Sequence, residues 1–197
     1  ALAVAIAVDA LGPDRVRGIR MPSKYSSKGS LSDAKESAKL LNIKIDTINI
    51  EEINKSYLGH LNDLFKYLDK DTTEENIQSR IRGVILMAVS NKFGEMLIST
   101  GNKSEISVGY TTIYGDMNGG FCALKDAYKT DVYNLSKWRN NNYNDLFLGP
   151  SGMAVPANSI TKEPSAELDF NQKDQDSLPD YEVLDEILIK IIEANNN

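Results

Sequence analysis

A dense set of polar side chains follows a short apolar segment near the middle of the chain. Residues 97–105 read Leu-Ile-Ser-Thr-Gly-Asn-Lys-Ser-Glu, so that a hydroxyl, an amide, an ammonium and a carboxylate follow within six positions. The apolar start predicts a buried strand, and open α/β sheets bind ligands at the carboxyl ends of their strands. This mixture of groups suits a polyphosphate and a metal ion. The alternative is an ordinary strand-to-helix turn, in which Thr100 and Asn102 only cap the next helix.

Further polar residues could join this site from other parts of the chain. Asp116 lies in a glycine-rich segment, residues 109–120. Asn76 and Arg80 are four residues apart, and Lys129 stands four residues after Lys125. Each pair would therefore share one face of a helix and could grip a ligand or neutralise phosphate. Most helical polar residues at this spacing simply face water, so the spacing alone leaves both interpretations open.

Several common chemistries are not indicated. The chain contains neither Gly-x-Gly-x-x-Gly nor Gly-x-x-x-x-Gly-Lys-Ser/Thr, which disfavours a dinucleotide oxidoreductase and a Walker-type ATPase. The single histidine, His60, has no second histidine or cysteine at metal-ligand spacing, and we expect it at a surface or interface. Cys122 has no plausible histidine base and is expected to serve in packing. We therefore do not expect covalent catalysis.

Length, charge and cysteine content narrow the class of protein. The chain has 197 residues, which is enough for one domain with a substantial core. Its 28 acidic and 22 basic residues give a net charge of −6, which argues against general nucleic-acid binding. One cysteine cannot form an internal disulfide, and no apolar run reaches membrane-spanning length. We expect a cytoplasmic protein with no membrane or nucleic-acid partner.

Hydrophobic periodicity predicts helices that alternate with strands. We expect helices at residues 1–8, 30–41 and 53–68, and a further helix that begins at Thr72, where Glu75 three residues later completes the helix-start pattern. We expect strands at residues 16–21, 43–50 and 96–99. Strands separated by helices imply crossover connections. The predicted fold class is therefore α/β, with a mostly parallel, doubly wound sheet and helices on both faces.

The second half of the chain is predicted to be less regular. Apolar residues from Leu124 and Ala127 to Trp138 form a helical stripe, residues 140–156 form a loop rich in Asn, Gly and Pro, and residues 181–192 form a last helix. We expect the loop to be mobile or to form a contact surface. Because residues 1–8 read as a buried helix whose beginning is cut off, we also expect a segment to precede Ala1.

Five segments, taken together and in order, resemble the NAD synthetases. They are residues 21–27 (Met-Pro-Ser-Lys-Tyr-Ser-Ser), 75–83 (Glu-Asn-Ile-Gln-Ser-Arg-Ile-Arg-Gly), 99–105 (Ser-Thr-Gly-Asn-Lys-Ser-Glu), 115–121 (Gly-Asp-Met-Asn-Gly-Gly-Phe) and 162–168 (Lys-Glu-Pro-Ser-Ala-Glu-Leu). Residues 116–121 and 174–181 are most similar to the glutamine-dependent branch. The resemblance runs nearly end to end.

The resemblance implies an adenine-nucleotide α-hydrolase-like fold, also called the ATP-pyrophosphatase fold, and a ligase reaction. With Mg²⁺ present, ATP as co-substrate would adenylate the nicotinic-acid carboxylate of deamido-NAD. Ammonia, supplied by glutamine or free in solution, would then displace AMP to give NAD. A carboxylate is a poor electrophile, so the site must hold two anionic substrates in line and neutralise phosphate charge. The resemblance also implies a homodimer or larger homo-oligomer, and a glutaminase domain upstream.

Residue roles implied by the resemblance follow position by position. The ATP site would comprise Met21, Thr100, Lys129 and Ser165. The residues implied at deamido-NAD are Asn76, Arg80, Glu105 and Asp116. Glu105 would also bind Mg²⁺, because its hard carboxylate oxygen suits that ion. The catalytic lysines would be Lys129 and Lys103.

Some family features are not matched. Ile113 stands where the ammonia-only branch has a lysine, and Gly120 stands where it has a substrate-binding aspartate. The family's Ser-Gly-Gly-x-Asp-Ser pyrophosphate loop would precede Ala1, and its basic C-terminal segment would follow Asn197. We expect residues 1–197 to be a single synthetase domain without that loop or a glutaminase domain, and on its own without adenylating activity.

Two other functions remain open. One is a related amide ligase of the same fold, similar to GMP synthetase or asparagine synthetase. The other is a nonenzymatic module that binds nucleotides without turnover. Asn76 and Arg80 together with residues 116–120 favour the NAD synthetases over the related ligases.

Overall fold

A computed structural model describes residues 1–193 of the chain. Its four strands form two parallel pairs: β1 (Arg17–Arg20) with β2 (Lys44–Thr47), and β3 (Ile98–Ser99) with β4 (Phe121–Cys122). A helix connects the strands of the first pair, so the crossover is of the kind that parallel strands need. The α/β class is confirmed, and the described strands form two separate two-stranded ladders.

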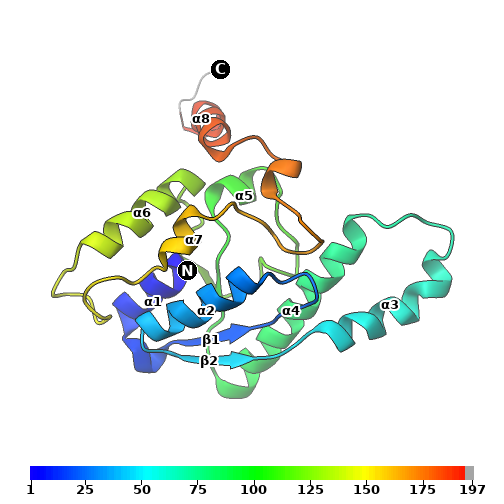
Figure 1. Cartoon of the computed structure of the whole chain (residues 1–197), viewed down its shortest axis with the longest axis horizontal. Coiled ribbons are helices and arrows are strands. Elements are labelled where there is room, and N and C mark those ends of the chain that lie inside the picture. The colour runs from blue at the N-terminus through cyan, green and yellow to red at the C-terminus, as the bar shows by residue number, and fades with distance from the viewer. Residues whose placement is uncertain (194–197) are drawn as a thin grey trace.

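The helices lie around these ladders. In Figure 1, α2 lies over β1 and β2, α3 and α4 extend together to one side, and α8 lies at the opposite end of the molecule from β2, above α5. The helices are α1 (Leu2–Leu11), α2 (Lys28–Leu40), α3 (Glu51–Phe65), α4 (Thr72–Phe93), α5 (Lys103–Ser107), α6 (Lys129–Asn141), α7 (Ala157–Thr161) and α8 (Tyr181–Ile192), with 3-10 turns η1 (Pro13–Arg15) and η2 (Asp174–Asp176).

The side chains that cap two helices differ from those predicted, although α4 begins at Thr72 as predicted. Ser27, not Ser30, caps α2, because the Ser27 hydroxyl accepts a hydrogen bond from the Ser30 amide at 3.0 Å. Helix α4 begins after Asp71, whose carboxylate accepts the Thr73 amide at 2.7 Å, rather than at a Thr72 cap. In both cases two neighbouring side chains of equal capping ability could accept the unpaired backbone amides of the first helical turn. Sequence spacing alone does not select which of the two side chains caps the helix.

Helix α6 is shorter at its start than the apolar stripe predicts. It begins at Lys129, where the Tyr128 amide donates to the Asp131 carboxylate at 3.2 Å. Leu124, Lys125 and Ala127 therefore lie outside the helix. Leu124 is nevertheless buried, because it packs in the core from the turn before α6.

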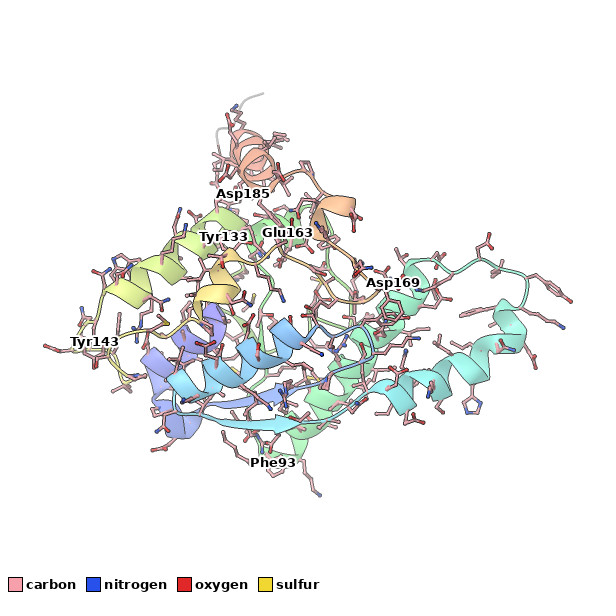
Figure 2. All side chains as sticks on the ribbon, viewed as in Figure 1. Phe93, Tyr133, Tyr143, Glu163, Asp169 and Asp185 are labelled. Atoms are coloured by element: carbon pink, nitrogen blue, oxygen red, sulfur yellow. The ribbon has the colours of Figure 1, made fainter. Side chains whose placement is uncertain are left out.

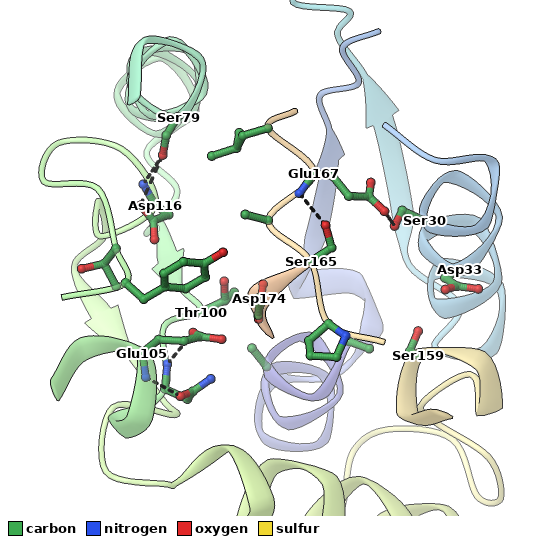
Figure 3. Close-up of a pocket in the computed structure, with 18 of the residues that line it drawn as sticks. Ser30, Asp33, Ser79, Thr100, Glu105, Asp116, Ser159, Ser165, Glu167 and Asp174 are labelled. Atoms are coloured by element: carbon green, nitrogen blue, oxygen red, sulfur yellow. Dashed lines mark hydrogen bonds between the residues drawn. The ribbon is translucent and has the colours of Figure 1, made fainter. Parts of the chain in front are cut away.

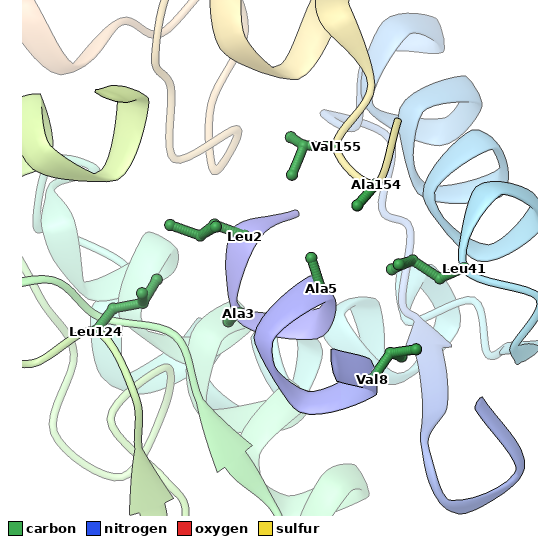
Figure 4. Close-up of a cluster of buried hydrophobic side chains, with 8 residues drawn as sticks. All are labelled: Leu2, Ala3, Ala5, Val8, Leu41, Leu124, Ala154 and Val155. Carbon is green, nitrogen blue, oxygen red and sulfur yellow. The ribbon is translucent and has the colours of Figure 1, made fainter. Parts of the chain in front are cut away.

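The main core forms around α1. Figure 4 shows side chains from α1 meeting Leu41, Leu124, Ala154 and Val155. The burial of Ala154 and Val155 corrects the expectation that residues 140–156 are a mobile or contact loop: its last residues are part of the core, and its first two belong to α6. The buried helix predicted at residues 1–8 is confirmed.

A buried ion pair fixes this loop on α1. The Arg139 guanidinium, 4% exposed, donates to both Asp9 carboxylate oxygens at 2.6 and 2.9 Å and to the carbonyls of Pro150 and Gly152 at 2.8 and 3.0 Å. Every nitrogen of the Arg139 guanidinium donates a hydrogen bond, which allows this charged group to be buried.

In the part of the chain that the structure describes, no helix is both long and apolar enough to cross a bilayer.

Candidate active site

A cavity of about 940 Å³ opens between α2, α4, α5, α6 and the segment before η2. Figure 3 shows side chains from all sides of it, including Thr100, Glu105, Asp116 and Ser165. Most of the residues predicted from the sequence line it, although they come from segments far apart in the chain: Met21, Asn76, Thr100, Glu105, Asp116, Lys129 and Ser165.

Glu105 and Lys129 form an ion pair on the cavity wall. Lys129 Nζ donates to Glu105 Oε1 at 2.8 Å, and both side chains are largely buried. Asn102 caps α5 by accepting the Glu105 amide at 3.0 Å, so the cap expected as the alternative is present beside the charged site. Burial acts to lower the pKa of Lys129, but the charge of Glu105 and its hydrogen bond outweigh burial and leave that pKa above its usual value.

A buried carboxylate of α8 supports this ion pair from behind. Asp185, 2% exposed, accepts hydrogen bonds from the Thr130 amide at 2.9 Å and from the Ser104 hydroxyl. The Ser104 hydroxyl in turn accepts the Lys129 amide at 2.9 Å. Figure 2 labels Asp185 where α8 faces α5 and α6. This network fixes the start of α6 and therefore the position of Lys129. It was not predicted, because no local sequence pattern pairs residues so far apart.

The loop that carries Asp116 rests on α4. Asp116 Oδ1 accepts the Thr112 amide at 2.6 Å and the Ser79 hydroxyl at 3.2 Å. The Thr112 hydroxyl donates to Asn76 Oδ1 at 2.7 Å. Asn76 and Asp116 are thus brought together through Thr112, and Asp116 organises the loop around it.

Two glycines make this close contact possible. A Cβ on Gly83 would lie 2.4 Å from Asn118 Nδ2 and 2.6 Å from the Tyr114 carbonyl oxygen. A Cβ on Gly115 would lie 2.3 Å from Ser79 Oγ. Either side chain would hold the loop away from the helix, since such distances are well inside van der Waals contact.

Residues 162–172 form a strap along the cavity wall, and Glu167 ties its first half to α2. The Glu167 carboxylate accepts hydrogen bonds from the Ser27 amide at 3.1 Å, the Ser27 hydroxyl at 2.7 Å, the Ser30 hydroxyl at 2.5 Å and Lys162 Nζ at 3.0 Å. Glu167 has a φ of 52°, which is unusual for a residue with a side chain. These bonds therefore hold a strained backbone position.

The other half of the strap is tied to α4. Gln78 Nε2 donates to the Leu168 carbonyl at 2.8 Å, and Gln172 Nε2 donates to Glu75 at 3.0 Å. Ser165 precedes both attachments; its hydroxyl accepts the Glu167 amide at 3.1 Å and donates to the Gln172 carbonyl. The strap therefore bridges α2 and α4 and presents Ser165 to the cavity.

Two predicted site residues are not among those that line the cavity. Lys103 Nζ is paired with Glu193 and, at 3.2 Å, with Asp126. Arg80 is exposed, and its Nε donates to the Ile113 carbonyl at 3.3 Å. The α4 residues that line the cavity include Asn76, Ser79 and Arg82 instead.

The cavity contains no complete metal site of its own. Among residues 1–193, no group of three or more histidine, cysteine, aspartate or glutamate side chains could hold a metal ion. Glu105 offers one largely buried carboxylate at the cavity wall. This fits Mg²⁺ that is bound by one or two carboxylates and completes its shell with phosphate oxygens and water.

The sequence profile of the NAD synthase family matches residues 1–197. The chain belongs to the NAD synthase family. A glutamine-dependent NAD(+) synthetase from Rhodobacter capsulatus is 52% identical over 197 residues, which is 100% of this chain and 36% of that relative. The chain spans about a third of the length of the curated relatives that it matches.

Solved structures of an NAD+ synthetase and of an NMN synthetase are similar to this chain. A glutamine-dependent NAD+ synthetase from Acinetobacter baumannii in complex with ADP superposes with a TM-score of 0.76 at 44% identity, covering 98% of this chain and 33% of that one. An NMN synthetase from Francisella tularensis gives a TM-score of 0.79 at 26% identity, covering 95% and 71%. The predicted family and ATP-pyrophosphatase-type fold are therefore confirmed.

Proposed function

We propose that the protein is an ATP-dependent ligase that converts deamido-NAD to NAD. The observation that carries this proposal is the convergence of Thr100, Lys129 and Ser165 with Asn76 and Asp116 on one cavity. The relatives named NAD(+) synthetase and the ADP complex of one of them support it. We infer that ATP lies near the first three residues and deamido-NAD near the last two.

The chemistry requires charge neutralisation and alignment rather than a protein nucleophile. Adenylation turns one carboxylate oxygen of deamido-NAD into part of a leaving group, AMP, and pyrophosphate departs; ammonia then attacks the activated carbonyl carbon. Lys129 would stabilise negative charge on the phosphates, and the Thr100 hydroxyl would donate a hydrogen bond to them. The Ser165 hydroxyl, which donates to the Gln172 carbonyl, would turn from that carbonyl to do the same. Holding both substrates on one wall converts the reaction into an effectively intramolecular one.

We propose Glu105 as the Mg²⁺ ligand of this chain. Bound Mg²⁺ would neutralise phosphate charge and orient the polyphosphate. Lys129 is the present partner of Glu105. Glu105 would hold the metal, and Lys129 would then bind phosphate. The elements that carry both residues stay fixed by Asp185 meanwhile.

The source of ammonia and the assembly are also proposals. We infer that glutamine supplies the ammonia through a glutaminase domain, since the relatives at about half identity are named glutamine-dependent. We infer a homodimer, supported by exposed apolar side chains on α3 and α4, among them Tyr57, Leu64, Val84 and Phe93. Light scattering of the full-length protein tests the dimer, and a single-protomer mass contradicts it.

The central test is a direct assay of the full-length protein. It should form NAD, AMP and pyrophosphate in equal amounts from deamido-NAD, ATP and Mg²⁺, with either glutamine or ammonium chloride present. The same assay with the GMP precursor and with aspartate separates related ligases, and ATP binding without turnover would indicate a sensing module. Absence of NAD from a folded protein that binds both substrates contradicts the proposal.

A second substrate deserves a parallel assay because of one comparison. The NMN synthetase superposes with a TM-score of 0.79 and is matched over 71% of its length. The alternative is therefore amidation of the corresponding mononucleotide. The ratio of kcat/KM for the two substrates decides, and we expect deamido-NAD to be preferred because the relatives at higher identity are NAD(+) synthetases.

A further inference from the structure

Four cationic side chains line the cavity within residues 1–193: Arg20, Arg82, Lys129 and Lys162. The two lysines already have carboxylate partners. Lys129 is paired with Glu105 at 2.8 Å and Lys162 with Glu167 at 3.0 Å. Their charges are therefore balanced before any ligand enters.

Arg20 has a different kind of partner, but it is also satisfied. Its Nη1 donates to the Leu31 carbonyl at 3.0 Å, and its Nε and Nη2 donate to the Thr47 hydroxyl at 3.3 and 2.9 Å. All three nitrogens of its guanidinium are engaged in tying β1 to β2 and α2. Arg20 therefore acts in the frame of the cavity.

Arg82 is the exception among the four. Its Nε donates to the Met21 carbonyl at 3.1 Å, which aligns the guanidinium at the end of β1. Within the described chain, its two Nη atoms make no hydrogen bond, and the side chain has no carboxylate within ion-pair distance. The residue is half-buried on the α4 face that also bears Asn76 and Ser79.

The two Nη atoms of Arg82 have no acceptor among the described residues, and an anion in the cavity could supply one. Burial acts to lower the pKa of Arg82, and the nearby charge of Glu167 acts to raise it; the net shift is downward. Arginine nevertheless stays protonated in proteins, so Arg82 keeps its charge. A guanidinium fork with two free nitrogens is shaped for two parallel hydrogen bonds to phosphate oxygens.

We propose that Arg82 binds a phosphate group of the nucleotide substrate through its two Nη atoms. This inference rests on the proposed function, because it assumes that nucleotides occupy the cavity. ATP is the expected source, since Met21 belongs to the predicted ATP site and its carbonyl holds Arg82 Nε. The phosphates of deamido-NAD share the same chemistry, and the test separates the two sources.

The experiment measures binding of ATP, adenosine and deamido-NAD, each with Mg²⁺, to the full-length protein by isothermal titration. For Arg82→Met we expect the Kd for ATP to rise about 10- to 100-fold, the effect of losing charge-assisted hydrogen bonds, while the Kd for adenosine stays unchanged. Arg82→Lys keeps the charge without the fork and should recover part of the loss. Arg15→Met is the matched control, because Arg15 is exposed on η1 and does not line the cavity.

The outcomes discriminate between a phosphate ligand and a structural residue. Equal losses for ATP and adenosine would overturn the proposal and leave Arg82 only as the support of Met21. An unchanged Kd for both nucleotides would overturn it as well, whereas a loss confined to deamido-NAD would support the phosphate contact on that substrate. NAD formation by the unmodified protein is measured separately, so failure of the proposed function and failure of the Arg82 contact are distinguishable.

Discussion

Lys129 Nζ lies 2.8 Å from Glu105 Oε1, where the starts of α6 and α5 meet at the cavity wall. The two residues are the predicted ATP-binding lysine and the predicted metal ligand. Each therefore neutralises the other in this structure, and we propose that substrates replace the contact. Because the pair is largely buried, removal of either partner leaves a charge that solvent screens poorly.

Replacing Glu105 tests its role as a metal ligand. Glu105→Gln keeps the shape and an oxygen for the Asn102 amide, but it removes the negative charge that suits Mg²⁺. We expect the Mg²⁺ concentration that gives half-maximal NAD formation to rise about tenfold or more. Steady-state rates over a Mg²⁺ series measure this, and an unchanged half-saturating concentration would show that another group holds the metal.

The two predicted catalytic lysines should differ in effect. Lys129 lines the cavity, whereas Lys103 is engaged by Glu193 and Asp126 away from it. We expect Lys129→Met to lower kcat/KM by about 100-fold or more, as for loss of a charge-stabilising group, and Lys103→Met to lower it less than about tenfold. Steady-state kinetics of the two variants, both shown to be folded, measures these losses. Equal losses in kcat/KM would indicate that Lys103 acts in the site as well.

The strap contact at Glu167 predicts an acid-dependent stability. Burial acts to raise the pKa of Glu167, but hydrogen bonds from Ser30, Ser27 and Lys162 outweigh burial and hold that pKa below the usual value of 4.5. A carboxylate with a lowered folded-state pKa stabilises the fold above the unfolded pKa, and this contribution is lost as pH falls through the folded pKa.

Thermal unfolding from pH 6 to pH 3 measures this contribution. Glu167→Gln should have a lower Tm than the unmodified protein at pH 6, and the two should converge as the pH falls below about 4.5. Glu52→Gln on exposed α3 is the control, and its Tm difference should be small throughout. A constant difference for Glu167→Gln across the range would mean that its ionisation is not the source of the stability.

Gly83 and Gly59 form a matched pair of helical glycines. A Cβ on Gly83 meets Asn118 and the Tyr114 backbone within 2.6 Å, whereas nothing lies within 4 Å of a Cβ on Gly59. Alanine favours the helix by about 1 kcal/mol at either site, so Gly59→Ala should stabilise. Gly83→Ala should instead destabilise by about 1–3 kcal/mol and weaken deamido-NAD binding. Urea unfolding tests both, and stabilisation by Gly83→Ala would contradict the close contact.

The ion pair between Asp9 and Arg139 should be worth far more than a surface pair. Asp9→Ala leaves the Arg139 guanidinium, 4% exposed, without its carboxylate, and we expect a loss of about 3–5 kcal/mol in the free energy of unfolding. Glu186→Ala removes an exposed pair with Lys190 and should cost about 0.5 kcal/mol or less. Comparable losses for the two variants would show that Arg139 finds another partner.

Local patterns in the sequence were sufficient to define most of the elements. The last helix was predicted at residues 181–192 and is found at Tyr181–Ile192, because a helix with one apolar face carries its signal within its own residues. The capping residues were not determined by local spacing, because Ser27 and Asp71 compete with Ser30 and Thr72 for the same few amides. The motifs also identified the family and named most of the predicted residues that the structure places on one cavity.

Only the tertiary structure decided which side chains face that cavity and what holds them there. Spacing places Asn76 and Arg80 on one face of α4, but the wall of the cavity contains Asn76 and Arg82, because periodicity gives relative angles and not the direction of the site. The contacts of Asp185 with Ser104 and Thr130, and of Glu167 with Ser27 and Ser30, gave no local signal, since these partners lie 55 to 140 residues away. Such contacts form only when distant segments pack together, so no local pattern in the sequence predicts them.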